Sequence, residues 1–419
     1  MAAPPVKPYL TIEDLPLAGK TALLRLDINA PIVNGRIQGK DRIEAAAATV
    51  DALCSKGAKV VILAHQGRKG GDDFTSLKEH AEVLDGFATA KVGFVADVAG
   101  PEAIAAIKAL PRGEALMLEN VRGLDDESKK GKPADLAKLP FVVALASVAD
   151  LYVNDAFSAA HRAQTSLVAF PEILPSAAGL TMDRELTALA KAVDEPERPA
   201  VYFLGGAKPE DSIAVMKANF AKGTLDTALL GGLVANLFML ARGHELGKPN
   251  VEILERKGIL KLLPEAQALL EEYDAGIVTP DSVAIKDGHG KRVDLWLEDL
   301  PTNHPILDLG DESIATYLDI IADAGSLMMN GPAGLYEDPA FAKGTKAVIG
   351  AFAESDAFSL MGGGHTVTAI GQFGLTFEDF GYVSLAGGAL MSYLTGEELP
   401  AVKALKDAAA RHRAPSPSP

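Results

Sequence analysis

Five apolar segments in the second half of this 419-residue chain each run directly into glycine. Each segment has the composition of a buried strand, and helical patterns follow the turns. In an open α/β sheet, such turns present backbone N–H groups and helix N-termini to phosphate, and glycine allows close approach because it has no Cβ. The turns follow segments 201–204, 228–230, 327–329, 358–361 and 382–385. Glycine also simply ends strands, but five such turns in one half of the chain, one of them carrying a lysine, predict a phosphate-binding crevice.

The charge balance argues against nucleic acid or an anionic membrane as the main partner. There are 40 basic and 56 acidic side chains, which gives a net charge of −16, whereas phosphate backbones require a basic surface. Cys54 is the only cysteine, so an internal disulfide and a cysteine-rich metal site are excluded. The N-terminus lacks the pattern of a secretory signal, and the most apolar segment, 228–241, is too short to span a bilayer. We therefore expect a cytoplasmic protein.

Strand-like runs alternate with helical patterns along the chain, which predicts parallel sheets built from βαβ units. In the first half the predicted strands are 21–26, 59–63, 92–95, 115–118, 142–145 and 151–153, and predicted helices include 42–55 and 101–110. A helical pattern at 183–192, followed by the proline-bracketed segment 195–199, marks a domain boundary.

The predicted fold class is α/β, with two Rossmann-like domains, each a parallel sheet flanked by helices, that face each other across a hinged cleft. The predicted domains are residues 1–180 and 200–394, joined by an interdomain helix and linker at 181–199. Residues 395–419 are expected to return to the N-terminal domain, with a disordered tail from residue 411 because that tail has nothing to bury.

Arginine and histidine gather beyond the predicted strands of the first half, at the edge where open α/β sheets bind ligands. Together with two nearby polar residues, the set is Asp27, Asn29, Arg42, His65, Arg68, Arg122, His161 and Arg162. Converging guanidinium groups suit a small phosphorylated carboxylate because they grip both groups bidentately. For each arginine alone, the alternative is an incidental surface ion pair. For Asp27 and Asn29 the alternative is a turn before Pro31, and for His161 it is a satisfied polar residue near the core.

In the second half, Lys208 follows two glycines after a strand, from where its ammonium group can reach a phosphate. The alternative is a solvated lysine at a helix start. No Walker A sequence occurs in the chain, and no dinucleotide fingerprint occurs at Gly205, which disfavours NAD. Glu337 follows 330–332 at a spacing that suits a ribose hydroxyl, although an exposed loop acid explains it equally well.

Together these segments resemble the phosphoglycerate kinase family. The resemblance extends from residues 23–31 to 396–400, with the family's motifs in the family's order. Several details resemble the archaeal branch: His65-Gln66-Gly67, the residues at 210–212, the segment 231–236, and His365 after the glycine triplet.

The resemblance implies reversible transfer of a phosphoryl group from ATP to the carboxylate of 3-phosphoglycerate, in glycolysis and gluconeogenesis. It implies that the basic set of the first domain binds 3-phosphoglycerate and that the second domain binds Mg-ATP or Mg-ADP. The implied nucleotide-binding residues are Gly205, Gly206, Lys208, Asn330, Pro332, Glu337, Gly362, Gly363, Gly364 and His365. The implied catalytic residues are Arg42, Lys208, Gly387 and Gly388. Mg²⁺ is the implied cofactor, but its protein ligands stay unknown because His365 stands where other branches have an aspartate.

Three departures from the family pattern leave alternatives open. Ser212 stands where many members have a second lysine, Pro209 follows Lys208 directly, and Leu385-Ala386 replaces a threonine-glycine pair, so that a hydroxyl is lost and a methyl added. Proline removes an N–H and biases the residue before it away from helical geometry. The alternatives are a paralogous kinase of another small carboxylate or phosphonate, and a non-catalytic binder of the same ligands. The oligomeric state is left open.

Overall fold

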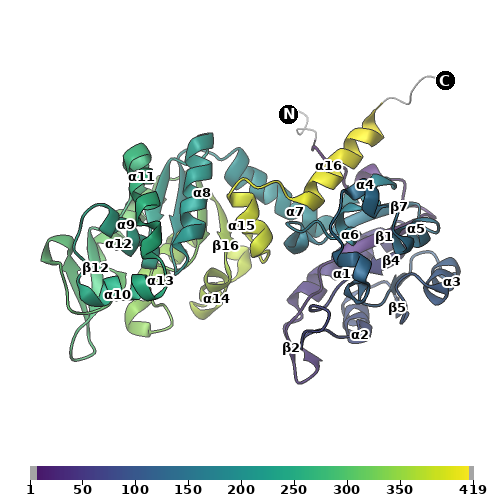
Figure 1. Ribbon diagram of the computed structural model, residues 1–419, viewed down its shortest axis with the longest axis horizontal. Coiled ribbons are helices and arrows are strands. Elements are labelled where there is room, and N and C mark those ends of the chain that lie inside the picture. Colours follow the sequence, from purple (N-terminus) through teal and green to yellow (C-terminus); the bar gives the residue numbers. More distant parts are fainter. Residues whose placement is uncertain (1–6, 415–419) are drawn as a thin grey trace. The chain divides into compact units, whose positions relative to one another are not determined.

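In the computed structural model, which describes residues 7–414, the strand Thr21–Leu26 (β1) is a central strand of a six-stranded sheet. The strand order is β5-β6-β4-β1-β7-β8, and all pairings are parallel. The other strands are Lys59–Leu63 (β4), Val92–Phe94 (β5), Ala115–Met117 (β6), Leu151–Asp155 (β7) and Ser176–Ala178 (β8). The central strands of this sheet are nearly continuous apolar runs, as expected where helices cover both faces of a parallel sheet (Figure 1).

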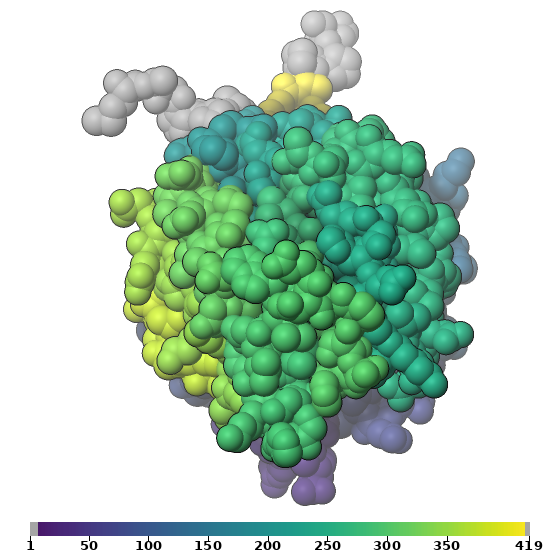
Figure 2. All heavy atoms as spheres, turned by 90° about the vertical axis from the view of Figure 1, so that its left-hand side faces the viewer, coloured from purple at the N-terminus to yellow at the C-terminus, as the bar shows by residue number. Residues whose placement is uncertain are grey.

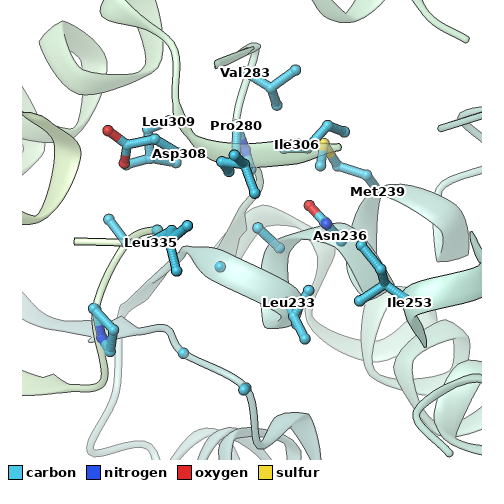
Figure 3. Close-up of a pocket in the computed structure, with 18 of the residues that line it drawn as sticks. Leu233, Asn236, Met239, Ile253, Pro280, Val283, Ile306, Asp308, Leu309 and Leu335 are labelled. Carbon is cyan, nitrogen blue, oxygen red and sulfur yellow. The ribbon is translucent and has the colours of Figure 1, made fainter. Parts of the chain in front are cut away.

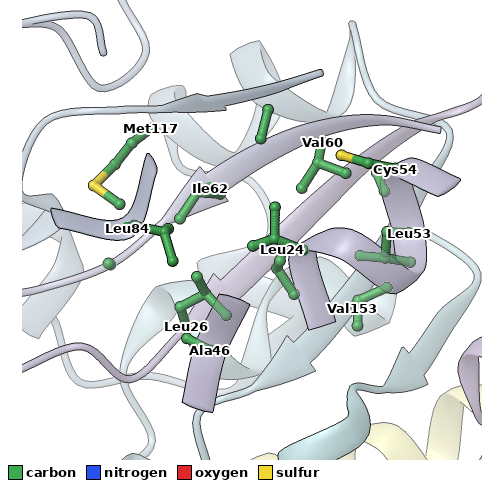
Figure 4. Packing of buried hydrophobic residues seen from close by; sticks show 14 of the residues in the cluster. Leu24, Leu26, Ala46, Leu53, Cys54, Val60, Ile62, Leu84, Met117 and Val153 are labelled. Carbon is green, nitrogen blue, oxygen red and sulfur yellow. The ribbon is translucent and has the colours of Figure 1, made fainter. Parts of the chain in front are cut away.

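Seven helices accompany this sheet among the described residues of the first unit. They are Asp41–Ser55 (α1), Lys78–Phe87 (α2), Pro101–Ala109 (α3), Pro133–Leu136 (α4), Pro140–Ala146 (α5), Thr165–Val168 (α6) and Pro400–Arg413 (α16). On one face of the sheet, Leu24 and Leu26 pack with Leu53 of α1 and Leu84 of α2 (Figure 4). Because side chains alternate along a strand, Arg25 lies on the opposite face.

A short hairpin follows β1 and precedes α1. Its strands are Ile32–Val33 (β2) and Arg36–Ile37 (β3). Asn34 and Gly35 form the turn with φ values of 51° and 72°, the left-handed geometry that an Asn-Gly pair favours in two-residue hairpins. The hairpin was not predicted, although this Asn-Gly pair is a sequence signal for it.

The second unit contains its own six-stranded parallel sheet, in the order β11-β10-β9-β15-β16-β17. The strands are Ala200–Leu204 (β9), Thr227–Leu230 (β10), Ile277–Val278 (β11), Ser326–Asn330 (β15), Phe358–Gly362 (β16) and Tyr382–Val383 (β17). The helices are Pro209–Lys222 (α8), Gly232–Ala241 (α9), Lys248–Arg256 (α10), Leu263–Tyr273 (α11), Asp311–Ala322 (α12), Lys343–Glu354 (α13), Gly364–Gln372 (α14) and Gly388–Leu394 (α15). All five predicted glycine turns follow strands of this sheet.

The second unit also has a three-stranded antiparallel sheet that was not predicted from the sequence. It is formed by Ser282–Lys286 (β12), Arg292–Trp296 (β13) and Ile306–Leu309 (β14), in the order β13-β12-β14. The hairpin of β12 and β13 lies at the left of Figure 1, and its green atoms lie at the front in Figure 2. Val283 and Ile306 form a small core of their own with Met239 of α9.

Contacts divide the chain into two units. The first comprises residues up to Glu185 and from Glu398 onward, and the second is Leu186–Glu397. The boundary falls within helix Leu180–Leu189 (α7), which continues into a wider helical turn at Ala190–Asp194. The predicted α/β class with two parallel sheets flanked by helices is confirmed.

Two local predictions were wrong. Residues 142–145 belong to helix α5 rather than to a strand, because a short apolar run is ambiguous and Pro140 starts a helix well. Residues 411–413 belong to α16 rather than to a disordered tail. Arg411 donates to the Pro171 carbonyl (2.6 Å) and Arg413 to the Lys7 carbonyl (2.9 Å), which ties this end of the helix to the first unit. Residues 415–419 of the predicted tail lie outside the described residues. No helix within residues 7–414 is long and apolar enough to cross a membrane.

Candidate active site

The predicted basic residues of the first unit gather at the carboxyl edge of its sheet. In register, Leu26 of β1 lies beside Asp155 of β7, and Arg25 lies beside Leu63 of β4. The loops that follow these strands therefore begin at the same edge. Asn29 reaches from one loop to the next, since its Oδ1 accepts a hydrogen bond from Gly67 N (2.8 Å).

The arginines of the first unit place their positive charge around His65. His65 is buried, and its pKa is lowered well below 6.5, first because of burial and then because of the positive charges of Arg25, Arg122, Arg162 and Arg42. The pKa of Arg122 is lowered to about 10, first by burial and then by other cations that include Arg162, Arg25 and Arg68. The structure thus brings His65 and the four predicted arginines together as one positively charged cluster, and such a cluster is built to receive an anion.

Asp27 lies beside this cluster and has unused hydrogen-bonding capacity. Its Oδ2 accepts hydrogen bonds from Arg42 Nη1 (3.0 Å) and from the Ser158 hydroxyl. Its Oδ1 is buried and has no hydrogen-bond partner among the described residues. A buried carboxylate oxygen without a partner is costly unless a ligand supplies one, so Asp27 is placed to accept a hydrogen bond from a substrate hydroxyl.

Gln66 holds these loops together, and its role was missed from the sequence. Its amide accepts from Ala30 N (2.9 Å) and from His80 Nε2 (3.0 Å), and it donates to Ala30 O (2.9 Å) and Asp73 O (3.1 Å). Asn120 adds a hydrogen bond to the Gln66 carbonyl (2.8 Å). All donors and acceptors of this buried amide are engaged, which fixes the loop that carries His65 and Arg68.

His161 and Arg162 contact each other, with Arg162 Nε donating to His161 Nε2 (3.1 Å). Both are half-buried, whereas Arg68 is exposed. The first unit therefore contains all eight residues that were predicted to bind the phosphorylated carboxylate. His65 and Arg122 are buried, and Arg42 pairs with Asp27.

In the second unit, the ends of three strands are aligned. Asn330 of β15 lies in register with Leu204 of β9 and with Gly362 of β16, so the turns after these strands lie at the same sheet edge. The glycines permit an unusually close packing of the turns. Gly206 N donates to Pro332 O (2.8 Å) and Gly232 N to Ala333 O (2.7 Å). These two N–H groups therefore hold neighbouring turns together and are not directed to a phosphate.

Lys208 immediately precedes helix α8 and is exposed. Pro209 is the first residue of α8, where proline is favoured because no intrahelical bond needs its N–H and its φ suits a helix. The departure at Pro209 is thus accommodated locally, and the Lys208 side chain stays available at a helix N-terminus.

A cavity of about 320 Å³ lies beside these glycine turns. Leu233, Met239 and Ile253 line it from α9 and α10, while Val283 and Ile306 line it from the antiparallel sheet (Figure 3). Asp308 also borders it but turns its carboxylate away, toward Arg292 Nη1 (2.8 Å) and Gly344 N (2.9 Å). A mostly apolar cavity of this size suits a flat heteroaromatic ring.

The polar rim of the cavity contains several predicted residues. Gly206, Pro332, Glu337 and His365 line it, whereas Gly205, Lys208, Asn330 and Gly362–Gly364 lie at the strand ends nearby without lining it. His365 Nδ1 lies 3.2 Å from the Tyr336 hydroxyl and 3.7 Å from Glu337 Oε1.

The departures at Leu385 and Ala386 lie just before α15. Leu385 is 36% exposed, whereas Ala386 is buried. The Ala386 N–H donates a hydrogen bond to the Ser384 hydroxyl oxygen (3.3 Å). Gly387 has a φ of 47°, in the left-handed region that favours glycine. The turn is therefore well formed without the family's hydroxyl.

Among residues 7–414 there is no group of three or more histidine, cysteine, aspartate or glutamate side chains that is suited to a metal ion.

Most of the cavity lining was missed from the sequence. The missed residues include Met239, Ile253, Val283, Ile306 and Leu309. The predicted residues that do line the cavity are Gly206, Pro332, Glu337 and His365. Leu233 and Asn236 belong to the segment 231–236, which contributed only to the family resemblance. The fold and the two candidate sites match those expected of an α/β phosphotransferase.

Comparisons with known proteins agree. The phosphoglycerate kinase family model matches residues 12–397. The chain is 42% identical to the phosphoglycerate kinase of Methanothermus fervidus over 405 residues, which cover 96% of this chain and 98% of that protein. It is 40% identical to that of Pyrococcus furiosus over 399 residues, covering 94% and 97%.

Two solved structures show the same fold. The crystal structure of phosphoglycerate kinase from Pyrococcus horikoshii OT3 matches with a TM-score of 0.83 and 39% identity, covering 95% of this chain and 99% of that one. The structure of phosphoglycerate kinase from Coxiella burnetii matches with a TM-score of 0.83 and 32% identity, covering 96% and 100%. The chain belongs to the phosphoglycerate kinase family, and the predicted resemblance is confirmed, including its archaeal character.

Proposed function

We propose that this chain transfers a phosphoryl group between ATP and the carboxylate of 3-phosphoglycerate, giving 1,3-bisphosphoglycerate and ADP. The observation that carries the proposal is the convergence of Arg42, Arg122 and Arg162 on His65. A ligand with both a phosphate and a carboxylate matches this concentration of positive charge. The reaction is reversible and belongs to glycolysis and gluconeogenesis, and we propose a cytoplasmic location.

In the proposal, the first unit binds 3-phosphoglycerate. Arg68, Arg122 and Arg162 bind its phosphate and carboxylate, with His65 and His161 as further donors. The free Oδ1 of Asp27 accepts a hydrogen bond from its hydroxyl, and Asn29 holds the loop that follows His65.

The second unit binds the nucleotide. The base enters the apolar cavity, and Glu337 at its rim accepts a hydrogen bond from a ribose hydroxyl. The phosphates lie at the glycine turns around Gly206 and Gly363, within reach of Lys208. Mg²⁺, when bound with the nucleotide, neutralises part of the phosphate charge.

Phosphoryl transfer from ATP needs no general base, because the attacking carboxylate is already deprotonated at neutral pH. Catalysis then consists of positioning and of neutralising charge on the transferred group. Arg42 and Lys208 supply that positive charge, and Gly387 and Gly388 let backbone N–H groups approach. Because each ligand is assigned to a different unit, the proposal also requires a hinge movement, which we place after residue 180.

Leu385 and Ala386, which depart from the family pattern, favour a second candidate. This candidate is a kinase whose acceptor is another small carboxylate or a phosphonate analogue. A panel of acceptors that includes 3-phosphoglycerate, glycerate and the phosphonate analogue of 3-phosphoglycerate tests the two. We expect 3-phosphoglycerate to have the highest kcat/KM, and a better phosphonate or glycerate acceptor would establish the second candidate. Calorimetric binding of both ligands without turnover of any acceptor would indicate a binder.

A further inference from the structure

A chain of buried hydrogen bonds runs from a carboxylate to His65 in the first unit. Glu127 Oε1 accepts a hydrogen bond from the Ser166 hydroxyl (2.7 Å), and Ser166 Oγ accepts one from Arg25 Nε (2.8 Å). Arg25 Nη2 then lies 2.9 Å from His65 Nδ1. Glu127, Ser166 and Arg25 are fully buried, and His65 is 5% exposed. We call these four residues the relay.

The direction of each hydrogen bond in the relay follows from the chemistry of its members. A guanidinium group only donates, so His65 Nδ1 must accept and can carry no proton. The neutral imidazole therefore has its proton on Nε2, the ring nitrogen that does not contact Arg25. Ser166 receives Arg25 Nε–H, which leaves its own hydroxyl proton for Glu127. Glu127 also accepts from Ser166 N (2.8 Å), so both of its oxygens act as acceptors.

We infer that Glu127, Ser166 and Arg25 are positioning residues that hold His65 as a neutral Nε2–H donor for the phosphorylated acceptor. Within the proposed function, His65 thus contributes a directed hydrogen bond while the arginines contribute the charge. The inference rests on the proposed function for the identity of the ligand, but the state of His65 can be measured without it.

The charges around His65 favour the same state. Arg25, Arg122, Arg162 and Arg42 all act on it, and a fifth positive charge among them would be repelled. Burial raises the pKa of Glu127, whereas Arg25 and the two hydrogen bonds from Ser166 oppose that rise. Both oxygens of Glu127 already accept hydrogen bonds from Ser166, so this carboxyl group does not need a charge on His65 to satisfy it.

Nitrogen NMR of the full chain, labelled at histidine, tests the state of His65 directly. The chain has eight histidines, and a His65→Gln variant assigns the signal. Between about pH 5.5 and pH 8, we expect Nδ1 to keep an unprotonated signature and Nε2 a protonated one, without titration. In Ser166→Ala and in Glu127→Gln, the two signals should move toward each other as the tautomers mix. A His65 that titrates near its ordinary pKa, or that is protonated on Nδ1, would overturn the inference.

Kinetics separate positioning from a general structural role. Ser166→Ala should raise KM for 3-phosphoglycerate about tenfold, the effect of losing one well-placed hydrogen bond, and leave KM for ATP unchanged. The matched control is Ser176→Ala, which removes another fully buried hydroxyl of the first unit, one that donates to Leu174 O (2.8 Å). Both KM values should be unchanged in that control.

Thermal melting first confirms that each variant is folded, and Glu127→Gln replaces Ser166→Ala if the latter does not fold. Equal KM effects in Ser166→Ala and Ser176→Ala would contradict a positioning role. If the wild-type chain does not bind 3-phosphoglycerate at all, the proposed function fails, while the NMR spectrum still decides whether the relay fixes His65.

Discussion

At the scale of single residues, His80 is a buried group whose protonation has a defined cost. Its Nε2 donates to the Gln66 amide oxygen, since that oxygen also accepts a backbone N–H and cannot itself donate. Its Nδ1 is buried without a hydrogen-bond partner among the described residues, and burial lowers the pKa of His80 to about 4. A proton on Nδ1 would therefore be a buried charge without a partner.

We predict that His80 makes stability depend on pH in mild acid. Its folded pKa of about 4 is below the ordinary value of 6.5, so between these values the unfolded chain binds more protons. The free energy of unfolding should fall as pH is lowered through this window, by about 3 kcal/mol from this group alone. Urea titrations at several pH values should show a shallower dependence in His80→Gln than in the wild type.

The control for that experiment is His289→Gln, which changes an exposed histidine and should keep the wild-type pH dependence. Asp155 acts in the opposite direction, because burial raises its pKa to about 6. The comparison between variants removes this contribution, since Asp155 is present in all of them. Identical slopes in His80→Gln and the wild type would show that His80 is not held neutral.

Lys208 supports a prediction about ligand binding. Removing its ammonium group in Lys208→Ala should weaken ATP binding at least about tenfold, the loss of one charge-assisted hydrogen bond. Binding of 3-phosphoglycerate, assigned to the other unit, should be unchanged in calorimetry. Lys217→Ala, at an exposed position of the same helix, is the control and should bind both ligands normally. Loss of 3-phosphoglycerate affinity alone would mean that the ligands have been assigned to the wrong units.

Sequence alone could suggest His65, Lys208, Arg68, Arg122 and Arg162, because they follow strands at the edge where such sheets bind ligands. It could not show Gln66, His80 or Ser166 as supporting residues. Their contacts join positions far apart in the chain, such as Arg25 and Ser166, which are 141 positions apart. Only the packed structure shows which polar groups meet in the interior.

At the scale of elements, the glycine turns of the second unit serve two purposes. The predicted reason for glycine was close approach to phosphate. The structure shows that several glycines first allow the turns to approach one another, since a Cβ on Gly205 would lie 2.2 Å from Pro332 O and one on Gly331 would lie 2.4 Å from Gly205 O. A sequence pattern shows that the backbone must pass close to something, but not what that neighbour is.

Gly363 and Gly364 provide a matched pair of substitutions in one turn. Gly363 has a φ of 86°, and a Cβ there would lie 2.4 Å from Asn330 Oδ1, whereas Gly364 is helical with open space around it. Gly363→Ala should lower the free energy of unfolding by about 2 kcal/mol through strain and collision. Gly364→Ala should leave stability unchanged or raise it slightly, because alanine favours helix over glycine.

Urea denaturation measures both variants. If Gly363→Ala were as stable as Gly364→Ala, the turn would not need left-handed geometry, and the predicted form of this phosphate-binding turn would be wrong.

At the scale of the whole molecule, alternation of strands and helices predicted both parallel sheets, because buried parallel strands form apolar runs that are easily read. The antiparallel sheet was missed because β13 is short and largely exposed, so it forms no buried apolar run. That omission also concealed the cavity, whose lining joins β12 and β14 to α9 and α10. Part of the apolar lining of a ligand site was therefore hidden in an antiparallel sheet that departs from the βαβ pattern.

The central claim is that this chain phosphorylates 3-phosphoglycerate on its carboxylate. It is tested most directly by trapping the acyl phosphate with hydroxylamine, in a mixture of purified protein, Mg-ATP and 3-phosphoglycerate. We predict abundant hydroxamate from the wild type and from Arg36→Ala, which changes a side chain that is 77% exposed. Arg42→Ala should lower turnover at least about a hundredfold with little loss of ATP affinity, since its charge acts on the transferred group. Folded wild-type protein that binds both ligands and yields no hydroxamate would contradict the claim.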